Sequence, residues 1–374
     1  MGASRFALLV VAMVGLHAAC SDSGPGAGVA DAGVADAGVD APVIVDAGVD
    51  AVAADAGVDA GNPCDGVDAG ADGLSDTLSC TGLYKNIATK ELATGVAPYT
   101  PANQFWSDGA EKSRFVLIPA GTKIDTTDMD AWQYPVGMKV WKEFRRGGKR
   151  VETRIFYKRA AGSWSRTTYR WNAGETEATR LDRGELAVGG STYEIPRASQ
   201  CDICHNGRPD ALLGFDAIGV GVAGATGMTL AKLAADGWLT QVPAKTTLAY
   251  PEDGTGKAAA ALAYVHTNCG GCHNPLAGAN AQFTGLYMAV RASQLITDVP
   301  VSGLDISSTA VGVASTSMGY NDGTWYRIAP GNPAKSESLD RATRRDDKQM
   351  PAIVSHEVDV VGVDALRQWI QALP

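Results

Sequence analysis

The chain has 374 residues, of which 45% are hydrophobic, and this is enough for two or three modest domains with real cores. Its formal net charge of -9 is unevenly placed, because twelve Asp and no Lys, Arg or Glu occur from Asp22 to Asp76. The rest of the chain is close to neutral and carries no basic stripe, so its composition gives no reason to expect a nucleic-acid partner.

The N-terminal residues 1–19 place Arg5 ahead of an apolar run, ALLVVAMVGL, that is too short to span a bilayer and is followed by small residues. We expect a signal peptide here. Cys20 follows directly, and LHAAC resembles the signal of bacterial lipoproteins, although His17 stands where that family prefers Leu. The resemblance implies acylation of Cys20 and an exported outer-membrane lipoprotein; a periplasmic protein without lipid is the alternative.

Residues 20–76 repeat Asp, Ala, Gly and Val and contain too few large side chains to offset the entropy of ordering. This composition predicts a disordered, extended tether; calcium binding is a weaker alternative, because the apolar positions needed to stack a coil are missing. Cys64 and Cys80 flank the end of the tether. In an oxidising compartment such a pair is expected to form a structural disulfide.

Residues 84–198 show short alternating runs rich in β-branched and aromatic residues, separated by turns, which predicts an antiparallel all-β sandwich-like or barrel domain. The clearest runs are 114–118 (RFVLI), 139–144 (KVWKEF), 151–158 (VETRIFYK) and 165–171 (SRTTYRW). The charged residues in these runs are expected to lie on solvated strand faces.

After residue 198 the apolar period lengthens to that of helices, so the second half is expected to be mainly α. Leu230, Leu233 and Ala234 predict a short helix ending at Gly237, and 257–267 is rich in alanine. A C-terminal helix is predicted by Val363, Leu366, Ile370 and Leu373. We expect a multidomain chain whose second half divides into segments 199–250 and 251–374, each of which contains one of the two cysteine motifs described next.

The five-residue pattern C-x-x-C-H occurs twice, as CDICH at 201–205 (the first frame) and CGGCH at 269–273 (the second frame). Two cysteines at this spacing can form thioethers to haem vinyl groups while the adjacent histidine binds the iron. A zinc site would need a second ligand pair beside each frame, and a redox dithiol would need a βαβ context. The frames therefore predict two covalent haems of the c type, held by Cys201, Cys204, Cys269 and Cys272, with His205 and His273 as iron ligands.

The neighbourhood of the second frame resembles the class I cytochrome c domain: a helix (AAAALAYVHT), then CGGCHN, then KQMPA and a terminal helix ending LRQWIQAL. The resemblance implies that His273 is the proximal ligand and Met350 the distal ligand, and that the helix before the frame packs on the terminal helix. The connection between His273 and Met350 is unusually long, and MPA replaces the commoner MPP.

The first frame lies in YEIPRASQCDICHNG after a segment reading FWSDGAEKSRFVLIPAG, and together these resemble a family of exported bacterial proteins that join a β domain to c-type haem segments. The family's function is poorly characterised. The sequence predicts no clear sixth ligand for this haem. The candidates are Met228, His266 and His356, each of which could instead be a core or surface residue.

These features predict a dihaem c-type cytochrome that passes single electrons between redox partner proteins of the cell envelope. The alternative is a peroxidase- or oxygenase-like dihaem enzyme in which one haem stays five-coordinate and binds substrate. In a third interpretation the β domain binds a carbohydrate or a protein and the haems are ancillary.

Overall fold

The computed structural model describes residues 64 and 69–374, which all fall within one compact unit, so the expected division into separate domains is not confirmed. The expected signal peptide, Cys20 and most of the tether lie outside the described residues. The tether was expected to reach residue 76, but Leu74 and Ser75 are buried. Leu74 belongs to an apolar cluster against the sheet, so the chain folds before the aspartate-rich segment ends.

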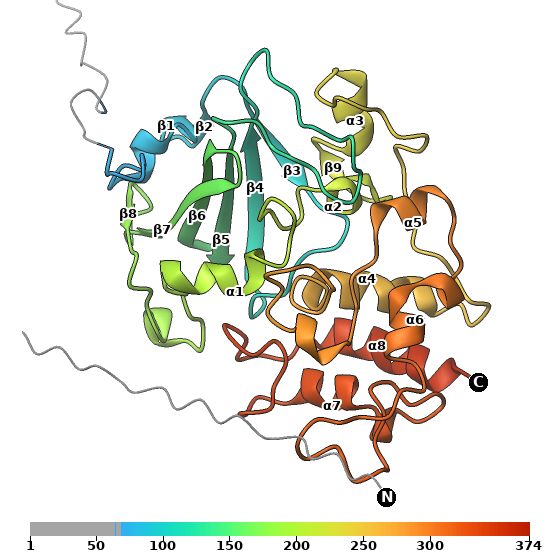
Figure 1. The fold of residues 1–374 in the computed structure, drawn as a ribbon. Coiled ribbons are helices and arrows are strands. Elements are labelled where there is room, and N and C mark those ends of the chain that lie inside the picture. Colours follow the sequence, from blue (N-terminus) through green and yellow to red (C-terminus); the bar gives the residue numbers. More distant parts are fainter. Residues whose placement is uncertain (1–63, 65–68) are drawn as a thin grey trace, which may run out of the picture. The chain divides into compact units, whose positions relative to one another are not determined.

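A seven-stranded antiparallel sheet dominates the N-terminal half (Figure 1). Its strand order is β8-β7-β6-β5-β4-β3-β9. The strands are β3 (Val96–Thr100), β4 (Glu111–Leu117), β5 (Lys139–Arg146), β6 (Lys149–Ala160), β7 (Ser163–Trp171), β8 (Ala178–Arg180) and β9 (Thr226–Gly227), and a separate two-stranded sheet holds β1 (Tyr84–Asn86) and β2 (Glu91–Leu92). The four runs predicted from alternation correspond to β4, β5, β6 and β7, and these predictions are confirmed.

The two faces of the large sheet are covered by different parts of the chain. One face carries Trp141, Ile155 and Tyr169, which pack in a cluster with Leu74, Leu78, Leu83 and Tyr84. The other face carries Val116, Val140 and Phe156, which share a cluster with residues 212–250 and with the C-terminal helices. The sequence predicted a sandwich-like pair of sheets. In the described residues, helices and loops supply the apolar side chains that cover the second face, and the only strand that follows the first frame there is β9.

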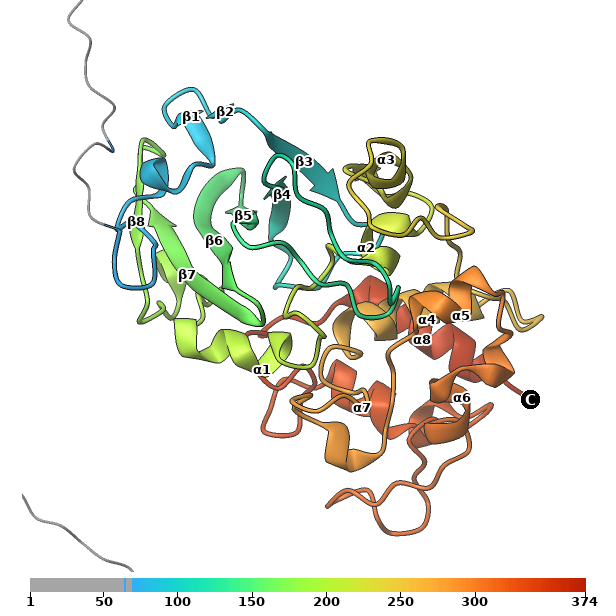
Figure 2. The ribbon, with the colours of Figure 1, turned by 45° about the horizontal axis from the view of Figure 1, so that its top comes forward.

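The second half of the described chain is mainly helical (Figure 2). Its helices are α1 (Cys201–His205), α2 (Ala217–Gly221), α3 (Leu230–Ala235), α4 (Ala258–Asn268), α5 (Ala292–Ile296), α6 (Asp305–Thr309), α7 (Glu337–Thr343) and α8 (Val360–Ala372). Short 3-10 helices are η1 (Leu78–Thr81), η2 (Val188–Gly190), η3 (Ala198–Gln200), η4 (Gln282–Thr284), η5 (Val301–Gly303) and η6 (Pro333–Lys335). The helices predicted near residues 230, 257–267 and 363–373 are confirmed as α3, α4 and α8.

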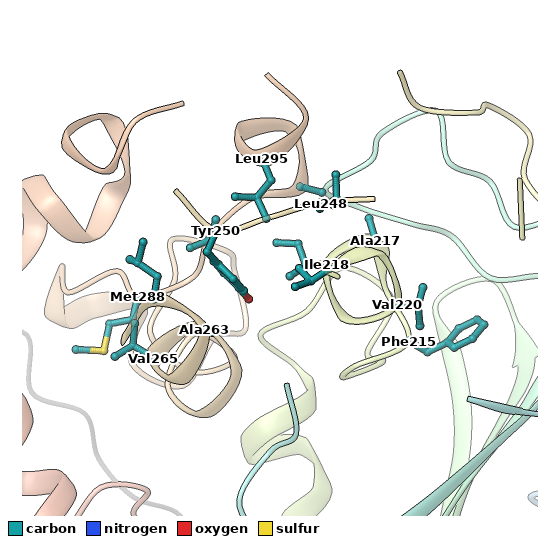
Figure 3. Packing of buried hydrophobic residues seen from close by; sticks show 14 of the residues in the cluster. Phe215, Ala217, Ile218, Val220, Leu248, Tyr250, Ala263, Val265, Met288 and Leu295 are labelled. Carbon is teal, nitrogen blue, oxygen red and sulfur yellow. The ribbon is translucent and has the colours of Figure 1, made fainter. Parts of the chain in front are cut away.

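The helical core is centred on α4, which packs against α8 and α2. Val363, Leu366 and Ile370 form the buried face of α8, as their spacing predicts, and α4 contributes Ala261, Leu262 and Val265. Figure 3 shows Ile218 of α2 facing α4, with Tyr250 and Leu248 nearby. None of the helices within the described residues is long and apolar enough to cross a bilayer.

Candidate functional site

The two frames lie against each other, although 63 residues separate His205 from Cys269 in the chain. The side chains of Cys204 and Cys272 share a hydrogen bond, and Cys272 Sγ also donates to the Ile203 carbonyl at 3.3 Å. The Asn274 amide, directly after the second frame, donates to the carbonyl of Gly207 at 3.0 Å. The fold therefore brings the two sequence motifs into one site.

Glycine is required where the frames touch. A Cβ added to Gly207 would lie 1.9 Å from the carbonyl oxygen of Gly271, which no side chain can tolerate. A Cβ on Gly278 would lie 2.9 Å from the carbonyl oxygen of Asn206. Both contacts are between the backbones of the first and second frame segments. Side chains at these positions would force the two segments apart.

All four frame cysteines carry free thiols, whereas the predicted disulfide between Cys64 and Cys80 is present. Burial raises the pKa of Cys269 to about 12 and also raises that of Cys201. The hydrogen bond with Cys272 is the main cause that raises the pKa of Cys204. The frame sulfurs are therefore half-buried thiols. In the described part of the chain, no group of three or more His, Cys, Asp or Glu side chains gathers around a potential metal position.

The first frame forms α1 and is attached to the sheet by its histidine and by the residues that follow. The His205 ring stacks on Phe156 of β6, with 4.3 Å between the ring centroids. The Asp210 carboxylate forms an ion pair with Lys158 of the same strand, and both side chains are almost fully buried. Asp210 also accepts hydrogen bonds from the Trp164 indole at 3.0 Å and the Tyr134 amide at 2.9 Å. These contacts fix the position of the first frame relative to β6.

His205 is held in one tautomer. Its Nδ1 lies 2.5 Å from the carbonyl oxygen of Ala211, and because a carbonyl can only accept, Nδ1 carries the proton and donates. The lone pair is then on Nε2, which makes no hydrogen bond within the described residues. Burial, with a further contribution from the Lys142 charge, lowers the pKa of His205 to about 3. The ring is therefore neutral at physiological pH and has the tautomer of an Nε2 metal ligand.

The second frame begins where α4 ends. His273 is partly buried, and its backbone carbonyl accepts a hydrogen bond from the amide of Met288 at 2.8 Å. Its Nδ1 atom is buried without a hydrogen bond of ordinary geometry. Burial is the main cause that lowers the pKa of His273, and the backbone of Leu286 acts in the opposite direction. A buried ring nitrogen that lacks a partner is unusual in proteins and often marks a site with another occupant.

Met350 is half-buried and lies in the segment before α8. Its amide donates to the carbonyl of Arg341 at 2.9 Å, and the Arg341 guanidinium is one of the charges that lower the pKa of His273. Arg341 therefore borders both residues. The assignment of Met350 as a ligand stays a prediction.

The FWSDG segment at 105–109 joins the sheet to both ends of the second frame region. The Trp106 amide donates to Asn268 Oδ1 at 2.7 Å, immediately before Cys269, and the Trp106 indole donates to the carbonyl of Glu357 at 2.8 Å. Asp108 Oδ1 accepts the amides of His356 and Glu357, each at 2.9 Å. The segment that follows Met350 is thus held by a buried carboxylate from the connection between β3 and β4.

The three candidates for a sixth ligand of the first haem differ in their surroundings. Met228 is buried in the core beside β3, where its amide donates to the carbonyl of Pro98. His266 Nδ1 accepts a hydrogen bond from the Val290 amide at 2.9 Å, so the other ring nitrogen carries the proton. His356 Nε2 pairs with the carboxylate of Glu194 at 3.0 Å. His266 therefore has no unprotonated nitrogen free of hydrogen bonds, whereas His356 donates through Nε2, because a carboxylate only accepts, and its Nδ1 makes no hydrogen bond within the described residues.

The charged residues of the strands are expected from the sequence to lie on solvated faces, and this prediction is wrong for several of them. Arg114, Glu143, Glu152 and Lys158 are all buried. Arg114, Lys142 and Arg154 lie directly opposite one another across β4, β5 and β6, on the face that carries Val116, Val140 and Phe156. Charges that alternate in phase with apolar residues indicate a covered face, and this signal was present in the sequence.

Comparison of the chain with protein-family models, with curated proteins and with solved structures finds no match.

Proposed function

We propose that this protein is a dihaem c-type cytochrome that transfers single electrons between partner proteins of the cell envelope. The observation that carries the proposal is the pair of C-x-x-C-H frames, whose four thiols are free and which fold against each other. Haem bound at these frames would supply an iron that cycles between the ferric and ferrous states. Two such centres in adjacent segments could exchange electrons directly.

The residues of both frames suit the group. Cys201 and Cys204 would form the thioethers of the first haem, and Cys269 and Cys272 those of the second. His205 supports this assignment because the Ala211 carbonyl already fixes its Nδ1 proton and leaves Nε2 as a lone-pair donor. The Nδ1 of His273 is buried without such an acceptor, so this ring lacks the contact that orients His205.

The chain's own residues would orient the ligands and limit access of water. Stacking on Phe156 and the hydrogen bond to Ala211 hold the His205 ring, and its lowered pKa keeps it neutral. Because the frames are closed against each other, attachment of a macrocycle at each would require the two segments to separate.

We also propose that residues 251–374 form a class I cytochrome c-like domain, with Met350 as the distal ligand of the second haem. The packing of α4 on α8 supports this, since the resemblance implies that arrangement for the helix before the frame and the terminal helix. The hydrogen bonds from the segment after Met350 to Asp108 give the loop a fixed attachment. The sandwich-like β domain, export and the lipid anchor at Cys20 remain parts of the proposal that rest on the sequence.

The alternative is a peroxidase- or oxygenase-like dihaem enzyme with one five-coordinate haem. One observation favours it: Nδ1 of His266 already accepts a hydrogen bond from the Val290 amide, so this ring has no free lone pair for a sixth ligand. Carbon monoxide titration of the reduced protein separates the two functions. Slow or absent binding at both haems supports the electron carrier, and rapid stoichiometric binding at one haem, with peroxide turnover, supports the enzyme.

The experiment that tests haem attachment is the alkaline pyridine spectrum of acid-acetone-extracted protein, produced with a c-type maturation system. We expect two covalent haems per chain, and one in each of the variants Cys201→Ser/Cys204→Ser and Cys269→Ser/Cys272→Ser. A Cys64→Ser/Cys80→Ser variant removes the same number of sulfurs outside the frames and is expected to keep two. A wild-type protein without covalent haem would refute the proposed function.

A further inference from the structure

A small cavity beside the first frame has three basic side chains in its wall. Its volume is about 40 Å³, and Arg114, Lys142 and Arg208 contribute to its wall together with Asp216, Tyr250 and His266. Arg114 and Lys142 are directly opposed on β4 and β5, and Arg208 lies three residues after His205. Three elements therefore bring cationic side chains to one enclosed space.

These cations have few partners among the described residues. Arg114 is 3% exposed, yet its guanidinium has one side-chain hydrogen bond, to Gln104 Oε1 at 3.1 Å. Lys142 has no hydrogen bond or ion pair in the described part of the chain, and Arg208 Nε is buried without a partner. Burying a charge without a counter-charge is costly, so a wall of this kind is expected to have an anionic occupant.

The other lining groups do not neutralise the wall. The Asp216 carboxylate accepts the Gly219 amide at 2.8 Å, as the cap of α2, and is within 4.0 Å of no Lys or Arg nitrogen in the described residues. Burial lowers the pKa of His266 to about 3, so this ring is neutral. Burial, with the neighbouring Arg114 and Arg154 charges, lowers the pKa of Lys142 well below its ordinary value, and an anion beside it would raise that pKa again. Two guanidinium groups and this lysine therefore face a single carboxylate.

We propose that this cavity is an anion site that holds a carboxylate between Arg114, Lys142 and Arg208, and that the carboxylate belongs to the haem of the first frame. Guanidinium groups bind carboxylates through paired hydrogen bonds, and the cavity has space for roughly a few water-sized groups. Arg208, Leu213 and Gly214, which follow His205 closely in the chain, all line the cavity and place it next to the first frame. This inference rests on the proposed function; a free carboxylate or oxyanion would have the same chemistry.

The test is a redox titration of the holoprotein and of Lys142→Met and Arg114→Gln. Loss of a cation leaves carboxylate charge near one iron, which favours the ferric state, so we expect the potential of one haem to fall. A tenfold change in its oxidised-to-reduced ratio corresponds to about 59 mV. Lys142→Arg should restore the potential. Lys149→Met, which removes an exposed lysine from β6, is the matched control. If Arg114→Gln does not fold, Lys142→Met alone tests the anion site.

A second arm distinguishes the source of the carboxylate. Acetate and inorganic phosphate are added to the wild-type holoprotein during the redox titration. If the haem carboxylate fills the cavity, neither anion changes the potential. If the anions shift it in the wild type and not in Lys142→Met, the site holds a free anion and the haem assignment is overturned.

Two haems with unchanged potentials in every variant, and no response to either anion, would overturn the anion site altogether. A chain without covalent haem would instead refute the proposed function. In that case calorimetric titration of the haem-free protein with phosphate still tests whether the cavity binds anions.

Discussion

Replacement of Asp108 by alanine is expected to release the segment that follows Met350. Asp108 is 1% exposed, and one of its carboxylate oxygens accepts the amides of both His356 and Glu357 at 2.9 Å. A hydrogen bond to a charged group contributes about 1.5–3 kcal/mol. Because water can reach the released amides, we take the lower end for each and expect the segment to lose about 3 kcal/mol of local stability. Since 1.4 kcal/mol is a factor of ten, local opening should become roughly a hundredfold more frequent.

Hydrogen exchange followed by mass spectrometry measures this opening directly. A peptide covering residues 352–359 should exchange roughly a hundredfold faster in Asp108→Ala than in the wild type. If Met350 ligates iron, the near-infrared band of its sulfur ligation should weaken in the same variant, because its loop has lost an attachment.

The control is Asp322→Ala, which also removes a carboxylate that accepts a backbone amide. That hydrogen bond, from Thr324 at 2.8 Å, is local and exposed. Exchange in 352–359 should stay at the wild-type rate in this control. Equal exchange in the wild type and Asp108→Ala, with both proteins folded, would show that the two hydrogen bonds do not hold the segment.

Three further predictions concern other parts of the chain. Met350→Ala should abolish the near-infrared band and lower the potential of one haem, and an unchanged spectrum would exclude Met350 as ligand. Cys20→Ser should move the protein from the membrane to the soluble periplasmic fraction. The pKa of His266 is about 3 in the folded state against 6.5 ordinarily, so only the unfolded chain binds a proton in between. The free energy of unfolding should therefore decrease as the pH falls below about 6.5, by at most about 1.4 kcal/mol per unit from this group. His266→Gln should make chemical denaturation less pH-dependent, whereas an equally steep profile would show that another group is responsible; His356→Gln is the control.

Local patterns in the sequence were sufficient to predict most of the elements. The alternation of apolar and polar residues predicted β4 to β7. The spacing of Val363, Leu366 and Ile370 predicted α8 and its buried face. Cys64 and Cys80 form the disulfide that their position at the end of the tether predicts. Each of these signals lies within a short window or depends on the redox compartment. The frames were identified in the same way, from the spacing of residues within five positions.

Contacts between residues that lie far apart in the sequence could not be predicted from local patterns. Nothing in the spacing of Cys204 and Cys272 indicates that their side chains meet, because the contact depends on how the intervening helices pack. The link from Asp108 to His356 spans 248 residues. The burial of Arg114 depends on the segments that cover its face of the sheet, although its phase with Val116 indicated a covered face. The cover of helices and loops on one face of the seven-stranded sheet has the same origin.

The close contact of Gly207 with Gly271 has a consequence for biogenesis. A thiol has to be reached by the attachment machinery before it can react with a vinyl group, yet Cys204 is half-buried and hydrogen-bonded to Cys272 in the folded chain. If haem is attached at both frames as proposed, we expect attachment to precede final folding, with the chain kept open until both cysteine pairs have reacted. Pulse-chase export with haem staining and limited proteolysis would establish the order. In that case the contact between the two glycines belongs to the haem-free chain, and a chain that closed in this way first would leave its thiols unreacted.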